Sequence, residues 1–432
     1  MLITSKARRL AYCAYIIAVF ILSTGAFLTI IAGSSDPEVL KAGTPITKCA
    51  WIGIYFISLV RVFHKRDWAA QILKNNLPLV ALLALASLSY LWSISPGATF
   101  RAVVQLLLTT CVAMDFCLSM PLESQLDLAA IALGFVIAAS VFLQLFLPSY
   151  VAIPMQSDPS ASSVGWCGVF GTKNEFGKTI VVALALFLSM PFVRRRLSVI
   201  LTASAIVLSH LAMATGSELN DVFLWTVSLI LPIIHWKPRP RMLAIISMFL
   251  IAMVVAGAAF TNAATATQAL GKDSTLTGRG PLWKLSLQYF RERPMLGHGW
   301  EAFWAQDSPD AIRIGQALNW PDVPHSHNQY IEILLGLGIA GLCVYFWLLA
   351  DFLRKALRYA RDLERRDRRW PLLLLAMVTV MFTTEAGAVS RGGIVWLLFS
   401  SAVFSMTAAE EELPDAASPQ IEETLELETV GA

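Results

Sequence analysis

Two histidines separated by one residue, His325 and His327, are the side chains in this sequence that best suit proton transfer. They stand in the segment Pro324-His-Ser-His-Asn-Gln-Tyr330, which runs directly into an apolar stretch. A neutral imidazole accepts a proton near neutral pH and can act as a general base toward a hydroxyl group. Two other interpretations stay open. The pair could bind a metal, although no cysteine or acid stands at ligand spacing, or it could cap a helix or anchor it at an interface.

Cationic side chains occur in glycine-rich segments that could bind an anion. Arg279 lies between two glycines, and a guanidinium can grip phosphate oxygens with two parallel hydrogen bonds. The segment from Gly165 to Lys178 leads into another apolar stretch, so helix amides and lysine charges would together form a phosphate cradle. The candidate binding residues are Arg101, Lys173, Asn174, Lys178, His298, Arg313, His325 and Asn328.

The elements that must position these residues are mostly membrane helices. The chain has 432 residues, of which 56% are hydrophobic and 15% are charged, and its mean hydropathy is +0.63. Soluble domains carry about 25% charged residues. The composition therefore excludes a disordered, collagen-like or ordinary cytosolic protein and predicts an all-α polytopic membrane protein. Nucleic acid is disfavoured as a partner, because no basic run accompanies a binding motif.

Stretches of about 20 apolar residues are long enough to cross a bilayer, and the sequence contains about 12 candidates. With this number of spans, all clusters of basic residues fall on the side of the N-terminus, which predicts that both termini are cytoplasmic. The first span is expected to be a retained anchor. The predicted spans are residues 10–32, 47–63, 77–94, 100–120, 126–147, 176–193, 197–213, 222–235, 242–262, 329–353, 370–385 and 392–407.

Two longer loops are expected on the opposite, outward side, at about residues 148–175 and 263–328. Within the second loop, Pro281 to Phe290 has a helical pattern with proline in its first turn. This helix is expected either to lie at the lipid interface or to pack on the ends of the spans. The predicted organisation is 1–262 with spans 1–9, 263–328 as a large outward loop, 329–407 with spans 10–12, and 408–432 as an acidic cytoplasmic tail.

Positive charges on the outward side need an explanation, because short outward loops disfavour them and a charge at membrane depth costs about 3 kcal/mol. Local pairing explains any one of them, for example Lys178 with Glu175 or Arg391 with Glu385. An anionic ligand is the better explanation for the whole set.

The ordered set of these segments resembles the O-antigen ligase and polymerase superfamily, most closely its exopolysaccharide-polymerase branch. Each motif is loose, and their order across roughly residues 80–400, with a long loop before the tenth span, gives the resemblance its specificity. The similar segments are Leu91-Trp92-Ser93…Pro96…Thr99-Phe100-Arg101, Lys173-Asn174, Thr277-Gly278-Arg279…Trp283, Arg293-Pro294…Gly297-His298-Gly299 and His327-Asn328.

The resemblance implies a GT-C-like bundle in which residues 263–328 form a periplasmic loop with short helices. Members act on sugars carried by undecaprenyl pyrophosphate at the outer face of the bacterial inner membrane, without a metal or other cofactor. His327 matches the family histidine, and Arg279 matches an arginine associated with the pyrophosphate. The expectation is a glycosyltransferase that polymerises lipid-linked oligosaccharide repeat units into exopolysaccharide. Membrane lipids and other exopolysaccharide assembly and export proteins are the further partners expected.

The sequence departs from the family pattern at one place. Many members carry a basic residue just before the eighth span, where this chain has Glu218. Lys173, Lys178 or Arg101 would then supply the missing charge, or the site handles its donor differently. The rival functions are a polysaccharide ligase of the same superfamily, a lipid-linked sugar transporter or flippase, and a non-catalytic scaffold of a secretion assembly.

Overall fold

The computed structural model describes residues 2–33, 43–147, 167–171, 173–189, 279–320, 323–360, 366–383, 386, 389 and 393–411. Every regular element within these ranges is helical, as the composition predicts, so the fold is an all-α polytopic membrane protein. In chain order the elements are α1 (Leu2–Ser23), α2 (Leu28–Ala32), α4 (Pro45–His64), α5 (Arg66–Lys74), α6 (Leu77–Leu88), η1 (Ser89–Trp92), α7 (Pro96–Ser119), α8 (Leu122–Phe146), α9 (Lys173–Ser189), α14 (Arg279–Phe290), α15 (Pro309–Ala317), α16 (Gln329–Tyr359), η4 (Arg366–Arg369), α17 (Trp370–Met381) and α18 (Ile394–Glu410).

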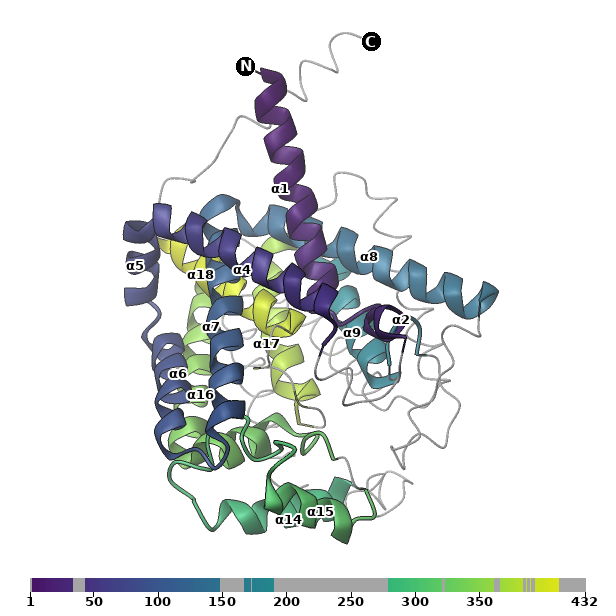
Figure 1. The fold of residues 1–432 in the computed structure, drawn as a ribbon. Coiled ribbons are helices and arrows are strands. Elements are labelled where there is room, and N and C mark those ends of the chain that lie inside the picture. Colours follow the sequence, from purple (N-terminus) through teal and green to yellow (C-terminus); the bar gives the residue numbers. More distant parts are fainter. Residues whose placement is uncertain are drawn as a thin grey trace, which may run out of the picture.

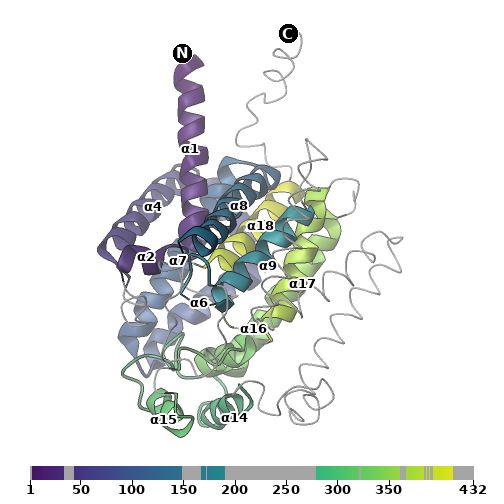
Figure 2. The ribbon, with the colours of Figure 1, turned by 90° about the vertical axis from the view of Figure 1, so that its right-hand side faces the viewer.

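Helix α18 lies at the centre of the bundle. It is apolar on all sides, and every residue from Ile394 to Thr407 is buried, as expected for a helix surrounded by other helices. It packs on α7 and α16, which in turn contact α6, and α4 covers the outer side of α7. Figures 1 and 2 show α8 and α9 beside this group, where α8 also contacts α1.

Several predicted spans coincide with helices that are long and apolar enough to cross a membrane. Among the described residues these are α4, α7, α8 and α16, and the pair of α5 with α6 and η1 makes a fifth if its bend of 96° interrupts one span. Helices α17 and α18 are apolar but shorter. The predicted spans 197–213, 222–235 and 242–262 lie outside the described residues, so the number of 12 stays a prediction. The protein is a multi-pass membrane protein.

Two predicted spans need correction. The span predicted at residues 10–32 is divided between α1, which ends at Ser23, and α2, which begins at Leu28 after a turn in which Phe27 has a φ of 64°.

The second is the span at residues 329–353. The pattern of residues 329–353 predicts one continuous helix, but α16 is interrupted at Gly338, whose φ of 66° and ψ of −161° are not helical. A side chain at this position would place its Cβ 2.4 Å from the Met295 carbonyl carbon. The break therefore requires glycine both for its backbone angles and for the close approach of the turn at residues 293–299.

The turn at residues 293–299 makes the hydrogen bonds that the interrupted helix cannot make. The amides of Ile339 and Ala340 donate to the carbonyls of Pro294 and Met295 at 2.8 and 3.1 Å. On the other side of the break, the carbonyls of Leu335 and Gly336 accept from the amides of the turn. Non-helical backbone near a membrane is stable only when protein satisfies its polar groups, and this turn meets that condition.

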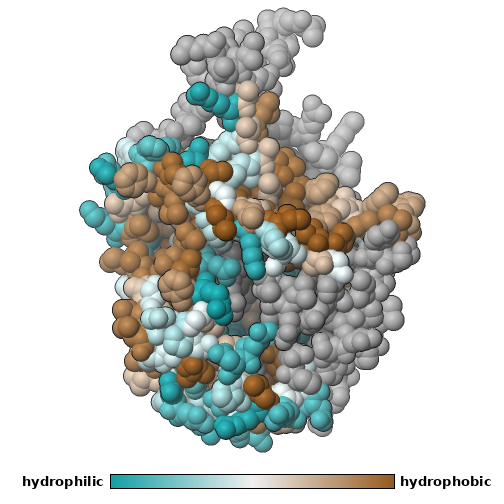
Figure 3. Space-filling view, viewed as in Figure 1, coloured by the Kyte–Doolittle hydropathy of each residue, from teal (hydrophilic) through white to brown (hydrophobic). Residues whose placement is uncertain are grey.

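The bundle has two ends of different character. Figures 1 and 2 show α14 and α15 together at one end, which we call the loop end, and the start of α1 at the other, which we call the tail end. Figure 3 shows hydrophilic side chains over the loop end and a hydrophobic surface over the middle of the bundle. Short hydrogen bonds join α5 to Glu411, so the end of α18 lies at the tail end.

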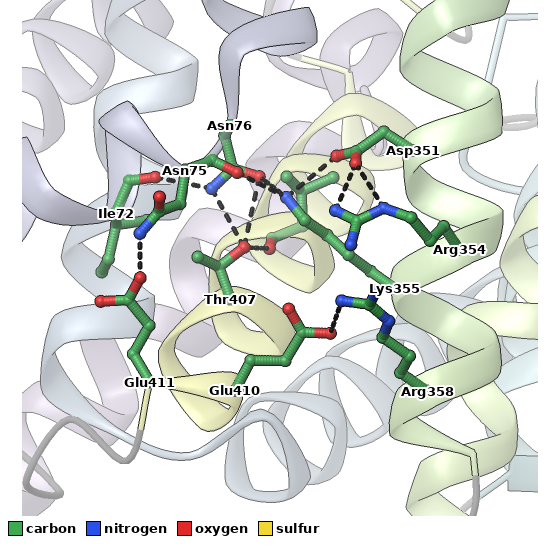
Figure 4. Close-up of polar contacts among 11 residues, drawn as sticks. Ile72, Asn75, Asn76, Asp351, Arg354, Lys355, Arg358, Thr407, Glu410 and Glu411 are labelled. Atoms are coloured by element: carbon green, nitrogen blue, oxygen red, sulfur yellow. Dashed lines mark hydrogen bonds and ion pairs between the residues drawn. The ribbon is translucent and has the colours of Figure 1, made fainter.

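At the tail end, Lys355 on α16 is buried and fully engaged. Its ammonium group donates to Asp351 at 2.9 Å, to the Asn75 carbonyl at 2.9 Å and to the Asn76 side chain. Thr407 on α18 completes the cluster through hydrogen bonds with Asn76 (Figure 4). Further ion pairs at this end join Arg354 to Asp351, Arg358 to Glu410 and Arg61 to Asp115. Charged groups thus join α16 to α18 and to the segment between α5 and α6, and join α4 to α7.

Candidate active site

The histidine-containing loop, residues 323–328, is held in place mainly through Ser326. Its amide donates to the Glu332 carboxylate at 2.6 Å, its hydroxyl donates to the Asn328 carbonyl at 3.0 Å, and its carbonyl accepts from the Trp283 indole at 2.8 Å. The Trp304 indole also donates to Glu332, at 2.9 Å. Each polar group of Ser326 is therefore fixed by a neighbour.

Asn328 caps the N-terminus of α16. Its side-chain oxygen accepts from the amides of Tyr330 and Ile331 at 3.0 and 3.2 Å, and its NH₂ group donates to the Thr383 carbonyl at 2.8 Å. Asparagine is a favoured capping residue, because this oxygen satisfies amides that have no partner within the helix. The capping role that the sequence left open for the histidines belongs to Asn328. Its part in substrate binding stays a prediction.

His327 occupies an unusual backbone conformation beside two other rings. Its φ of 53° lies in the left-handed region, which is uncommon outside glycine and clusters at functional sites. Its amide donates to the His325 Nδ1 at 3.1 Å. The ring centroids of His325 and Trp320 lie 4.2 and 5.6 Å from that of His327, and the Trp320 plane is tilted from it by only 26°. The imidazole is buried, whereas His325 and Trp320 are half-buried.

Arg279 is the first residue of α14, the helix predicted at Pro281–Phe290, which is confirmed and begins two residues earlier. Residues four apart lie on one face of a helix, so Arg279 shares a face with Trp283, whose indole contacts Ser326. The start of α14 therefore lies close to the histidine-containing loop. Leu282 and Trp283 are buried in a cluster with Phe303, which matches the second of the two placements expected for this helix, packing on the bundle.

Two segments that carry the family resemblance pack against each other at the loop end. The Trp92 indole donates to the Leu296 carbonyl at 2.9 Å, and the Ile94 amide donates to the His298 carbonyl at 2.9 Å. The Thr99 hydroxyl donates to the Trp300 carbonyl at 3.0 Å. The stretch from Leu91 to Arg101 thus supports the same turn that fills the break in α16.

His298, a predicted binding residue, is buried inside this packing. Its Nδ1 lies 3.1 Å from the Leu335 carbonyl, and its ring contacts Phe303 edge to face. Burial lowers the pKa of the imidazole, so the neutral form is the one that the fold favours. The position shows His298 as part of the scaffold, and a role in binding substrate stays a prediction.

The remaining cationic candidates lie on three different helices. Arg101 is exposed on α7. Arg313 on α15 is largely exposed and pairs with Asp310 at 3.2 Å. Lys178 pairs with Glu175 at 2.9 Å, which is the local pairing that the sequence allowed. Lys173 and Asn174 lie in the first turn of the same helix, α9, which packs on α8 and α17. Glu218 lies outside the described residues.

Sequence reasoning missed Glu332, Trp304 and Trp320 as residues of the site. Glu332 and Trp304 fix Ser326, and Trp320 stacks on His327. A partial signal existed for Trp320, since Ser308-Pro309 is a helix start and Asn319 a helix end, so a short helix that delivers a tryptophan could have been predicted. The contacts of Glu332 depend on tertiary packing and had no local signal.

The comparisons with known proteins cover this region. A family model described as O-Antigen ligase matches residues 203–346, which include Arg279, His327 and most of the loop end. The exopolysaccharide production protein ExoQ of Rhizobium meliloti (strain 1021) is 25% identical over 308 residues, covering 66% of this chain and 67% of the relative. Both matches agree with the resemblance of this chain to the O-antigen ligase and polymerase superfamily. The superfamily match thus falls on the α14 segment, the turn at residues 293–299 and the histidine-containing loop.

Proposed function

We propose that this protein is a member of the superfamily and polymerises undecaprenyl-pyrophosphate-linked oligosaccharide repeat units into exopolysaccharide at the periplasmic face of the inner membrane. The name of the similar protein, an exopolysaccharide production protein, supports the product class. The observation that carries the chemistry is the hydrogen bond from Trp283 to Ser326. It holds the helix that begins with Arg279 against the loop that contains His327.

The proposed reaction is a glycosyl transfer with lipid pyrophosphate as the leaving group. A hydroxyl oxygen of the acceptor unit forms a bond to the anomeric carbon of the donor, and the bond from that carbon to the pyrophosphate oxygen breaks. His327 takes the hydroxyl proton, a contribution worth about 10²–10⁴-fold in rate. Arg279, with Arg101 or Lys173, stabilises the charge on the departing pyrophosphate, and one such donor is worth about 3–4 kcal/mol. No further energy source is needed, because the donor linkage is already activated.

The arrangement of the loop end suits this chemistry because groups other than the Arg279 and His327 side chains hold its backbone in place. Backbone amides, carbonyls and indole N–H groups fix the turn at residues 293–299 and the Ser326 backbone. A preorganised site avoids reorganisation cost at the moment of reaction. The polyprenyl tails would lie in lipid between the helices, which places the pyrophosphate at the membrane surface.

A polysaccharide ligase is the second candidate, favoured by the description of the matching family model. The two functions differ in product. Loss of long chains with single repeat units still present indicates a polymerase, whereas loss of attachment to a lipid core indicates a ligase.

The transporter alternative is disfavoured by the interruption of α16. In transporters, the freed ends of broken helices point at the substrate or ion. Here the amides that follow the break already donate to Pro294 and Met295, so they cannot also bind a ligand. Lipid-linked repeat units that accumulate outside the membrane in a deletion strain would agree with a polymerase, and accumulation inside would indicate a flippase.

The decisive experiment replaces Arg279 by Ala and His327 by Asn, with Arg291→Ala as a matched control. Asn tolerates the left-handed backbone of residue 327, so it removes the imidazole without adding strain. Arg291 is exposed just after α14. We expect each site variant to lower polymer formation by about 10²-fold or more at equal expression. Glycans resolved by length on a gel are the measurement.

Full-length polymer at normal amounts in either well-expressed site variant would contradict the role proposed for that residue. Loss of polymer in Arg291→Ala to the same extent would show that α14 tolerates no charge change, and the assignment of Arg279 would then fail.

A further inference from the structure

Helix α15 ends in a motif that aims one aromatic residue at the candidate active site. Its N-terminus is capped by Ser308, whose hydroxyl accepts from the Ala311 amide. At its C-terminus Asn319 has a φ of 50°, the Asn319 amide donates to Gln316 at 3.3 Å, and the Trp320 amide donates to Gly315 at 2.8 Å. These two bonds define a Schellman motif, which reverses the chain direction over the last turn. The reversal fixes the position of the Trp320 backbone relative to α15.

The helix is attached to the same cluster as the site. Ile314 is buried among Leu282 and Ile331, which belong to α14 and α16, so α15 cannot move independently of them. Its capped end then brings the Trp320 ring within 5.6 Å of the His327 ring, with the two planes nearly parallel. Stacking at this separation is the favourable range for aromatic pairs.

The backbone around His327 is held by the contacts of its two neighbours, whereas the plane of its ring also depends on the groups packed against it. Ser326 is held by Glu332 and Trp283, and Asn328 is held as the cap of α16. The orientation of the imidazole depends on its two side-chain torsions and on the groups packed against the ring. His325 touches it at an interplanar angle of 58°, whereas Trp320 covers one of its faces. The indole thus packs nearly parallel to the imidazole and limits the rotation of that ring.

We propose that Trp320 is a positioning residue for His327, which it holds in the orientation needed to accept a proton from the acceptor hydroxyl. This inference rests on the proposed function. The indole face also attracts the imidazolium that forms when the proton is accepted. Trp320 acts through His327 and does not touch the substrate, so it contributes to the rate of transfer and not to the affinity for the lipid-linked donor or acceptor.

The test compares Trp320→Phe, which keeps a stacking ring, with Trp320→Met, which fills space without one. Ile312→Ala is the control, because Ile312 is 45% exposed on the same helix. Transfer rates are measured with purified protein in lipid nanodiscs and lipid-linked repeat unit extracted from a strain that lacks this chain. We expect Trp320→Met to lower kcat by about 10²-fold with KM unchanged, the cost of a misplaced catalytic group. Trp320→Phe restores most of the rate, and Ile312→Ala behaves as wild type.

Two results would overturn the proposal. A raised KM with unchanged kcat in Trp320→Met would show that the indole contacts the sugar itself. An unchanged kcat and KM would show that the stack has no role. The unfolding midpoint of each variant is measured beside its rate. If Trp320→Met does not fold, Trp320→Gln, which suits a half-buried site, takes its place with the same two criteria.

Failure of this proposal can be separated from failure of the proposed function. If His327→Asn abolishes transfer while Trp320→Met keeps its kcat, only the positioning role is wrong. If His327→Asn transfers at the wild-type rate, the proposed base is wrong and the role of Trp320 goes with it.

Discussion

The two ends of the bundle are built from different interactions. At the tail end, charged side chains pair with one another, and buried Lys355 joins α16 to the segment between α5 and α6 (Figure 4). At the loop end, the turn at residues 293–299 and the histidine-containing loop are held by backbone hydrogen bonds, indole N–H groups and ring stacking. Both ends contain cations. Among the described residues, those of the tail end join helices through charged pairs, whereas at the loop end the Arg293 guanidinium donates to the Trp92 carbonyl at 3.2 Å.

Under the proposed function, this difference keeps cations of the loop end available for binding a ligand. A cation that already holds a helix in place cannot change partners without a loss of stability, since breaking a buried ion pair is costly. Arg101 is exposed on α7 and Arg313 is largely exposed on α15, so a ligand can approach either without disturbing the scaffold. The same contrast predicts that substitutions at the tail end change stability, whereas those at the loop end also change activity.

The largest effect on stability is expected at Lys355. Its replacement by Met removes the donor from the Asn75 carbonyl and the Asn76 side chain and leaves Asp351 with Arg354 alone. Loss of one partner of a buried pair costs about 3–5 kcal/mol, and the remaining Arg354 keeps the loss near the lower value. We expect the free energy of unfolding in detergent to fall by about 3 kcal/mol, with transfer activity per folded molecule unchanged.

Lys74→Met is the matched control for this prediction, because Lys74 is exposed on α5 at the same end of the bundle. Its effect on the free energy of unfolding should stay within about 0.5 kcal/mol. Equal effects of the two substitutions, or a selective loss of activity in Lys355→Met, would break the proposed division between the two ends.

A smaller effect, on both stability and activity, is expected at Asn328. Asn328→Ala removes the cap of α16, which costs about 1–2 kcal/mol, and it also frees the residue next to His327. Asn328→Ser keeps an oxygen that can accept from the same amides, so it should recover part of the stability. We expect both the unfolding free energy and the polymer yield to fall in the alanine variant. Retention of full activity in the folded alanine variant would show that the cap does not position His327.

Local patterns in the sequence predicted most of the long apolar helices and the outward helix at Pro281–Phe290, but not α15, because hydropathy, proline and spacing act within a few residues. The resemblance to the superfamily brought Arg279 and His327 into one hypothesis. The interruption of α16 was missed, since the apolar run from Gln329 onward continues through Gly338. The break depends on the turn at residues 293–299 that fills it, a contact between segments about 40 residues apart that no local pattern contains.

The assignment of single side chains was harder for the same reason. Asn328 and His298 were grouped with the binding residues because polar residues at a membrane surface suggest a ligand. Their hydrogen bonds go to Tyr330, Thr383 and Leu335, partners that only the folded chain brings together. Residue type predicted that these groups needed partners, and tertiary packing decided which ones they found.

The smallest effect is expected from His298, through pH. Burial lowers its pKa in the folded protein below the ordinary value near 6.5, so the unfolded chain binds the proton more readily. Stability from this group is therefore fully present above about pH 6.5 and is lost as the pH falls toward the lowered pKa of the fold. We expect the unfolding midpoint to decline between about pH 7.5 and about pH 5.5. The decline should be smaller in His298→Asn, whose amide still donates to Leu335 but does not titrate. An identical pH dependence in the two proteins would show that other groups set it, and that the loop end does not depend on a neutral His298.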